Sequence, residues 1–175
     1  MSSSMEREAG TEDCCYNGFL EIMRGLPLFA GVPLEVSKVL AYLCQAGTFL
    51  PGEALVREGE HAEDFFHLTR GRVQVTRLAG GSSVPVRELA PGASFGGLSL
   101  VLGRKSLFSV SALEETSAMI LTRGKFLKAV QRFPQVEPAL LRSLAEHVLA
   151  WEERFLTRHP EEFASLGGDF GLTLF

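Results

Sequence analysis

Short apolar runs separated by glycine turns are the feature that most limits how residues 45–122 can fold. In residues 72–78, apolar Val73 and Val75 alternate with polar neighbours. An alternation with period two is typical of a half-buried β-strand. Turn sequences recur between these runs, as at Pro51-Gly52 and Gly80-Gly81. Evenly spaced short strands joined by glycine turns predict a mainly β fold, an antiparallel jelly roll or barrel.

Helices are expected on both sides of this β region. Apolar residues at helical spacing predict two N-terminal helices, one after Asn17 and one over residues 33–43, and a short helix over 126–133. A last long helix begins near Glu137, with Pro138 tolerated in its first turn. The expected strands cover residues 49–50, 54–57, 65–68, 72–78, 84–89, 107–112 and 118–122.

The chain of 175 residues, 46% of them hydrophobic, is long enough for one domain with a good core and a helical appendage. We expect a disordered leader over residues 1–16, because this stretch is polar and has few apolar residues. The β-roll domain should span 17–134 and a C-terminal helix 135–158. Residues 159–175 are expected to form a tail.

Composition excludes several classes of function. The formal net charge of −4 argues against a basic nucleic-acid-binding face, so we expect no direct DNA binding by this chain. No apolar run is long enough to cross a bilayer and the N-terminus does not resemble a signal peptide, which together predict a cytoplasmic protein without membrane contact. Cys14, Cys15 and Cys44 have neither zinc-ligand nor disulfide spacing, so reduced thiols without an assigned role are expected.

The most distinctive stretch is residues 91–112, PGASFGGLSLVLGRKSLFSVSA. It reads as a Pro-Gly turn, a Phe-Gly-Gly step into one or two helical turns, a basic corner at Arg104-Lys105 and a return strand. Backbone N–H groups at such a helix start have no partner and carry partial positive charge. The stretch is therefore suited to an anion.

The order of the turn motifs resembles the cyclic nucleotide-binding domain of catabolite activator-type regulators, kinase regulatory subunits and gated channels. The resemblance covers residues 26–155. It rests on Leu26-Pro27-Leu28-Phe29, Pro51-Gly52-Glu53, Glu58-Gly59, Gly71-Arg72-Val73, Leu89-Ala90-Pro91-Gly92, Phe95-Gly96, Val110 and Ala112.

This resemblance implies a phosphate-binding cassette after the Phe-Gly step. In the family, a Glu directly after the glycine binds the ribose 2′-hydroxyl, and an Arg nine residues later binds the cyclic phosphate. Those positions are Gly97 and Ser106 here, so we predict a degenerate cAMP/cGMP pocket. Each lost charge-assisted hydrogen bond contributes about 1.5–3 kcal/mol, and losing both weakens binding by roughly two to four decades.

Other residues of the cassette keep part of the chemistry. The backbone amides from Gly96 to Leu98 remain, and the hydroxyls of Ser99 and Ser106 can donate to an anion. Arg104 or Lys105 could replace the missing Arg, although we interpret both as solvated loop charges. One of the bulky residues Leu107 and Phe108 is expected to fill part of the pocket. The candidate ligand-binding residues are Phe95, Gly96, Gly97, Leu98, Ser99, Arg104, Lys105, Ser106 and Leu107.

The last helix carries an apolar seam at alternating spacings of three and four residues. This spacing is typical of a coiled-coil interface, and it predicts a homodimer. The alternative is that the seam packs on its own domain, because two heptads are fewer than a secure coiled coil needs. The predicted interface residues are Leu141, Leu144, Val148, Trp151 and Phe155.

Two functional hypotheses follow. The first is a non-catalytic regulatory or signalling module, without a cofactor, that acts through dimerisation and contacts with an unidentified protein. The alternative is a small-molecule sensor that binds a cyclic nucleotide or cyclic dinucleotide by non-standard contacts. A metal-dependent enzyme on a related β fold is not favoured, because His61 and His67 do not alternate on one strand as a shared metal face requires.

Overall fold

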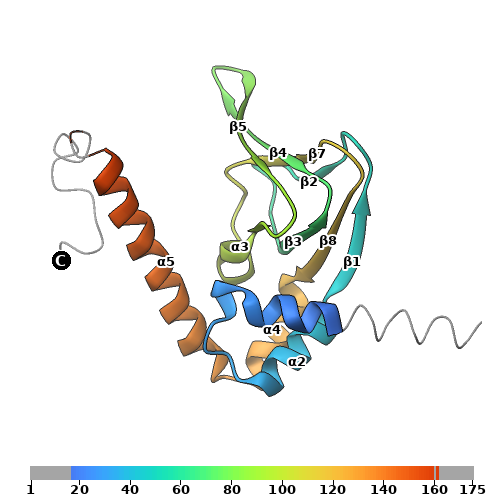
Figure 1. Cartoon of the computed structure of the whole chain (residues 1–175), viewed down its shortest axis with the longest axis vertical. Helices are drawn as coiled ribbons and strands as arrows, with labels where there is room; N and C mark the ends of the chain where they lie inside the picture. The colour runs from blue at the N-terminus through green and yellow to red at the C-terminus, as the bar shows by residue number, and fades with distance from the viewer. Residues whose placement is uncertain (1–16, 160, 162–175) are drawn as a thin grey trace, which may run out of the picture.

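The structure is a computed structural model that describes residues 17–159 and residue 161. Within them, antiparallel strands form two four-stranded sheets, ordered β1-β8-β3-β6 and β2-β7-β4-β5, that face each other as a roll (Figure 1). The strands are β1 (Gln45–Phe49), β2 (Ala54–Val56), β3 (Asp64–Arg70), β4 (Val73–Ala79), β5 (Ser82–Leu89), β6 (Ser94–Phe95), β7 (Ser109–Ala112) and β8 (Thr116–Thr122). The expected mainly β jelly roll with flanking helices is confirmed.

Helices gather at one end of the roll (Figure 1). They are residues 17–25, the 3-10 helix η1 (Pro27–Phe29), α2 (Leu34–Leu43), α3 (Gly97–Leu102), α4 (Arg123–Arg132) and the long α5 (Val136–Arg158). The predicted leader over 1–16 and most of the predicted tail over 159–175 lie outside the described residues.

Strand β8 of the first sheet is buried on both faces because it lies between the helices and the roll interior. On β8, Met119 and Leu121 belong to the core that the helices share, whereas Ala118 and Ile120 face the interior of the roll. Successive side chains of a strand point to opposite faces. A strand covered on both sides therefore has a continuous apolar run, which explains why residues 118–121 show no polar alternation.

One predicted strand starts later than expected. Residues 107–112 were expected to be extended, but β7 begins at Ser109. The Ser106 hydroxyl donates to the Phe108 carbonyl at 2.7 Å and lies 3.2 Å from the Phe108 N–H, which donates to it. This side-chain turn competes with strand pairing, so Leu107 and Phe108 are held outside the sheet.

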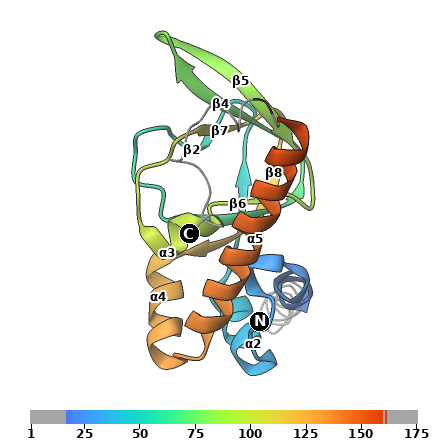
Figure 2. The same cartoon turned by 90° about the vertical axis from the view of Figure 1, so that its left-hand side faces the viewer.

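The long helix α5 is anchored near its start and leaves the domain toward its end. The Ser143 hydroxyl donates to the Pro27 carbonyl at 2.5 Å, which joins α5 to η1. Figures 1 and 2 show the later turns of α5 extending away from the helical layer toward the level of the β4–β5 hairpin. Among the described residues, no helix combines the length and apolar character needed to cross a membrane.

Candidate ligand-binding site

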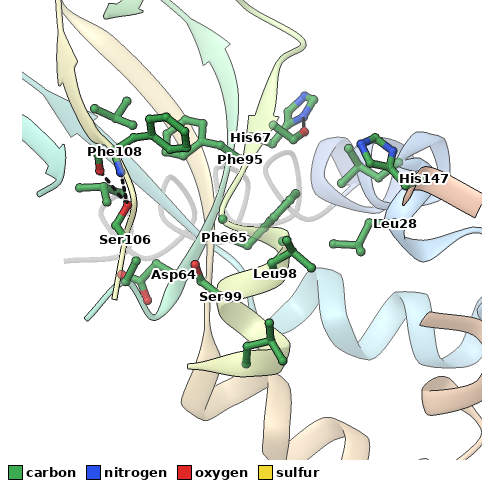
Figure 3. Close-up of a pocket in the computed structure, with 18 of the residues that line it drawn as sticks. Leu28, Asp64, Phe65, His67, Phe95, Leu98, Ser99, Ser106, Phe108 and His147 are labelled. Carbon is green, nitrogen blue, oxygen red and sulfur yellow. Dashed lines mark hydrogen bonds between the residues drawn. The ribbon is translucent and has the colours of Figure 1, made fainter. Parts of the chain in front are cut away.

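A cavity of about 980 Å³ lies beside residues 94–108, which we call the cassette. Figure 3 draws side chains from the cassette, β3, η1 and α5 around the same space. Strands β2, β4 and β7 add one valine each to its lining. The cavity thus joins the mouth of the roll to the helical layer. All nine candidate ligand-binding residues line it: Phe95, Gly96, Gly97, Leu98, Ser99, Arg104, Lys105, Ser106 and Leu107.

Gly96 sets the direction in which the cassette leaves β6. Its φ of +83° lies in the left-handed region that side chains disfavour. A Cβ at this position would collide with the backbone carbonyl oxygen of Asp64 on the neighbouring strand β3. Both constraints require glycine, and together they turn the chain from β6 directly into α3.

Gly97 occupies the position where the resemblance expects a carboxylate. A Cβ built on Gly97 would lie 3.0 Å from Cδ2 of Leu28, a residue of η1. This is closer than ordinary side-chain packing, so a side chain at position 97 would require the end of Leu28 to shift by a few tenths of an ångström. Position 97 carries no side chain, and Leu28 takes part of the space beside it.

Ser106 occupies the position where the resemblance expects a guanidinium. Its hydroxyl makes the turn with Phe108, and its backbone pairs with the loop before β3. The Ser106 N–H donates to the Glu60 carbonyl at 2.9 Å, and the Gly59 N–H donates to the Ser106 carbonyl at 2.9 Å. The side chain and both backbone groups of Ser106 therefore serve the local structure.

Arg104 and Lys105 are exposed residues on the same loop. The Ala62 N–H donates to the Arg104 carbonyl at 3.4 Å, and Lys105 forms an isolated bridge with His61. Both side chains border the cavity, and no ion pair of either is found among the described residues. They are exposed cations at the rim of the cavity.

Two titratable groups of β3 line the cavity. Nδ1 of His67 lies 2.8 Å from Oγ of Ser94, which is its register partner on β6. Burial lowers the pKa of His67, because the charged imidazolium is desolvated. Burial, with a smaller contribution from the Glu63 carboxylate, raises the pKa of Asp64. The surroundings thus disfavour the charged form of both groups.

Helix α5 contributes to the cavity in a way that sequence reasoning missed. Ser143, Leu144 and His147 line it opposite the cassette. Leu144 belongs to the predicted dimer seam, yet it is half-buried against its own domain. The four-residue spacing of Ser143 and His147 places both on one helix face, but nothing local in the sequence says which element that face meets.

No three His, Cys, Asp or Glu side chains within the described ranges are grouped so that they could hold a metal ion. His61 and His67 lie on different elements, one bridging to the cassette loop and one bonded to Ser94.

The comparisons with known proteins agree with this geometry. Residues 47–133 match the family model described as "Cyclic nucleotide-binding domain". The chain is 30% identical over 128 residues to the cyclic AMP receptor protein of Thermus thermophilus, covering 72% of this chain and 59% of that protein. It is 26% identical over 139 residues to human cGMP-dependent protein kinase 2, covering 78% of this chain and 18% of the kinase. The match thus spans less than two thirds of either relative.

Solved structures share the fold. The N-terminal domain of a transcriptional regulator from Streptomyces coelicolor A3(2) superposes with a TM-score of 0.67 at 26% identity, covering 75% of this chain and 95% of that one. The catabolite activator protein of Thermus thermophilus superposes with a TM-score of 0.60 at 25% identity, covering 74% and 62%. From the matched residues and the shared roll, this chain belongs to the cyclic nucleotide-binding domain family.

Proposed function

We propose that this chain is a non-catalytic regulatory module that does not hold cAMP or cGMP through the two side-chain contacts of its family. The observation that carries the proposal is the pair Gly97 and Ser106. Leu28 lies against the first position, and the hydroxyl of the second is bonded to Phe108. A cyclic phosphate at this place would meet neither a guanidinium nor a carboxylate from the expected positions. Regulation then works through protein contacts.

Thermal-shift measurements with cAMP, cGMP and cyclic dinucleotides test this part. A ligand present at 100 times its dissociation constant adds about 2.7 kcal/mol to stability, which is a clear rise in melting temperature. We expect millimolar cAMP to give no clear rise. A clear rise with cAMP or cGMP would show that other groups replace the missing contacts, and it would end the degenerate-pocket proposal.

The second part of the proposal is that α5 forms a homodimer. Leu141, Val148 and Trp151 of the seam are exposed, and the Trp151 ring stacks on Phe155 with centroids 5.5 Å apart. The early turns of α5 are tied to the domain through Ser143 and the half-buried Leu144. Exposed apolar residues on one helix face are stabilised by burial against a second copy of that face.

Sedimentation velocity on a Trp151→Glu variant tests the dimer. A charge in the middle of the seam should shift the protein to a monomer. Leu149→Glu is the matched control, because Leu149 is also an exposed apolar residue of α5 but lies outside the seam. An unchanged sedimentation profile for Trp151→Glu would remove the seam as an interface.

A second candidate function is a small-molecule sensor with a ligand other than a standard cyclic nucleotide. The cavity itself favours it, because 980 Å³ lies within the range of small-molecule sites and its lining joins the cassette to α5. A ligand that touches both the cassette and α5 would stabilise the position of α5 to which it binds more tightly, and the population of that position would rise. The two candidates differ in one measurement, since only the sensor gains stability from a small molecule.

A further inference from the structure

The cassette side of the cavity shows apolar side chains that the core of the protein does not use. On α3, Leu100 is fully buried in the core shared with the helices, whereas Leu98 and Leu102 are exposed and line the cavity. Leu107 and Phe108 are also exposed there. A short helix needs one apolar face to attach it to the domain, and Leu100 supplies that face. The remaining apolar residues gather on a concave wall, where small ligands bind.

The other walls are also apolar, although Phe65 on one of them is a buried residue of the core. Leu28 from η1, Phe65 from β3 and Leu144 from α5 also line the cavity, and Leu28 lies against Gly97 of the cassette. In Figure 3, Leu28, Phe65 and His147 lie around the space that Leu98 borders. Apolar surface that surrounds a space of this size favours a ligand that removes water from it.

Charge is arranged around this space in a way that favours an uncharged occupant. The cations Arg104 and Lys105 are exposed at the rim. The carboxyl group of Asp64 lines the cavity and would repel an anion. Nδ1 of His67 and Oγ of Ser94 lie 2.8 Å apart, and this hydrogen-bonded pair can donate a hydrogen bond to a polar group or accept one from it. His147 is the remaining titratable side chain that the structure places on the lining from α5.

We propose that this cavity binds an uncharged, predominantly apolar small molecule, with its apolar part between α3, η1 and α5 and a single polar group at His67 and Ser94. This inference rests on the second candidate function, in which the cavity senses a small molecule. The proposed ligand is uncharged, whereas a cyclic nucleotide carries a negatively charged phosphate that requires a cation beside it. The same apolar contacts that hold the ligand would connect the cassette to α5.

The first measurement uses the neutral fluorophore N-phenyl-1-naphthylamine, whose emission rises in apolar surroundings, with the full chain. We expect saturable binding and displacement by 1-decanol. Decanoate has the same chain length with a carboxylate in place of the alcohol, and we expect it to displace the fluorophore at least about tenfold less effectively. Displacement by decanoate alone would show that Arg104 and Lys105 capture an anion, and it would overturn the proposal, as would the absence of saturable binding.

Matched variants place the binding. Leu98→Asp puts a charge on the cavity wall at a side chain that is 58% exposed, and Leu50→Asp puts one at a side chain that is 64% exposed outside the lining. We expect about a tenfold loss of fluorophore affinity for the first and no change for the second. Leu107→Asp repeats the test at another exposed lining residue if Leu98→Asp has a lower melting temperature. Equal binding by the cavity variants and the control would overturn the proposal.

Adding cAMP to the same assay separates this inference from the proposed degenerate pocket. Displacement of the fluorophore by micromolar cAMP would contradict the degenerate pocket, whatever the apolar compounds do. Failure of fluorophore and decanol to bind, with no effect of cAMP, would contradict the apolar ligand and leave the degenerate pocket standing.

Discussion

The interior of the roll and the cassette wall are both lined by apolar side chains, but the first is closed and the second is open. Leu68 and Val73 are fully buried in the roll, whereas Leu98 and Leu107 of the cassette are exposed. The comparison teaches that the same residue type has two uses in this molecule. In the roll it stabilises the fold, and beside the cassette it forms a surface that folding leaves uncovered.

Leu68→Ala should give the largest effect, because it removes a fully buried side chain from the roll. Leu→Ala changes in a close-packed core lower the free energy of unfolding by about 2.7–5 kcal/mol. Leu107→Ala on the cassette wall should change it by less than about 0.5 kcal/mol, because Leu107 is 70% exposed and Leu68 is 0% exposed. Urea denaturation of both variants measures the difference. Similar losses would mean that the cassette wall belongs to the core after all.

Gly96→Ala should lower the free energy of unfolding by about 2–4 kcal/mol, from the left-handed backbone and the collision with Asp64. Gly81→Ala is the matched control, because its φ of +81° is nearly the same and a Cβ there meets nothing within 4 Å. The control should lose only about 1–2 kcal/mol. An equal loss in both variants, measured by thermal denaturation, would show that backbone strain alone fixes the cassette entrance.

Restoring the charged pair should convert the open wall into an anion site. A Gly97→Glu, Ser106→Arg double variant should bind cAMP about 100-fold more tightly than the natural chain, about 2.7 kcal/mol, because two charge-assisted hydrogen bonds become available. Adding Leu28→Ala should increase the gain, since Leu28 lies against position 97. Isothermal titration calorimetry measures the series. If the natural chain binds cAMP as tightly as the double variant does, the cassette wall already holds an anion, and the contrast drawn above is wrong.

The smallest expected effect is a pH dependence from the cavity wall. The folded protein binds fewer protons at His67 than the unfolded chain does below the ordinary pKa of 6.5, because burial lowers the pKa of His67. The contribution of His67 to the free energy of unfolding is therefore present above pH 6.5 and is lost as the pH falls through the pKa of His67 in the folded protein. Asp64 has the opposite effect on stability. Because its pKa is raised from 3.8, its contribution is present below pH 3.8 and is lost as the pH rises through its folded pKa.

Urea denaturation from about pH 7.5 to about pH 5.5 should show a smaller loss of stability for His67→Gln than for the natural sequence. Glutamine keeps a polar group near Ser94 without titrating in this range. Parallel curves for the two proteins would show that His67 is as solvated as an exposed histidine.

The sequence by itself determined most of the strands, the turns and which residues stand at positions 97 and 106. Period-two alternation, glycine turns and apolar residues at helical spacing are all patterns among residues that lie close together in the chain. The β roll and most helix bounds could therefore be predicted. The absence of charge at Gly97 and Ser106 is also read directly from the sequence, because it depends only on which residues stand at these two positions of the motif. The start of β7 at Ser109 could not be predicted in this way, because the Ser106 hydroxyl competes with the sheet for the backbone of Phe108.

Tertiary structure alone decided what surrounds those positions. Leu28, residue 97 and His147 lie far apart in the sequence, and only the packing of η1 and α5 beside the cassette brings them to one cavity. The sequence shows an apolar residue at position 98 and another at position 100, but it does not show that one is exposed in a cavity and the other buried. Which of two such neighbouring apolar residues is buried depends on what the rest of the chain places against it.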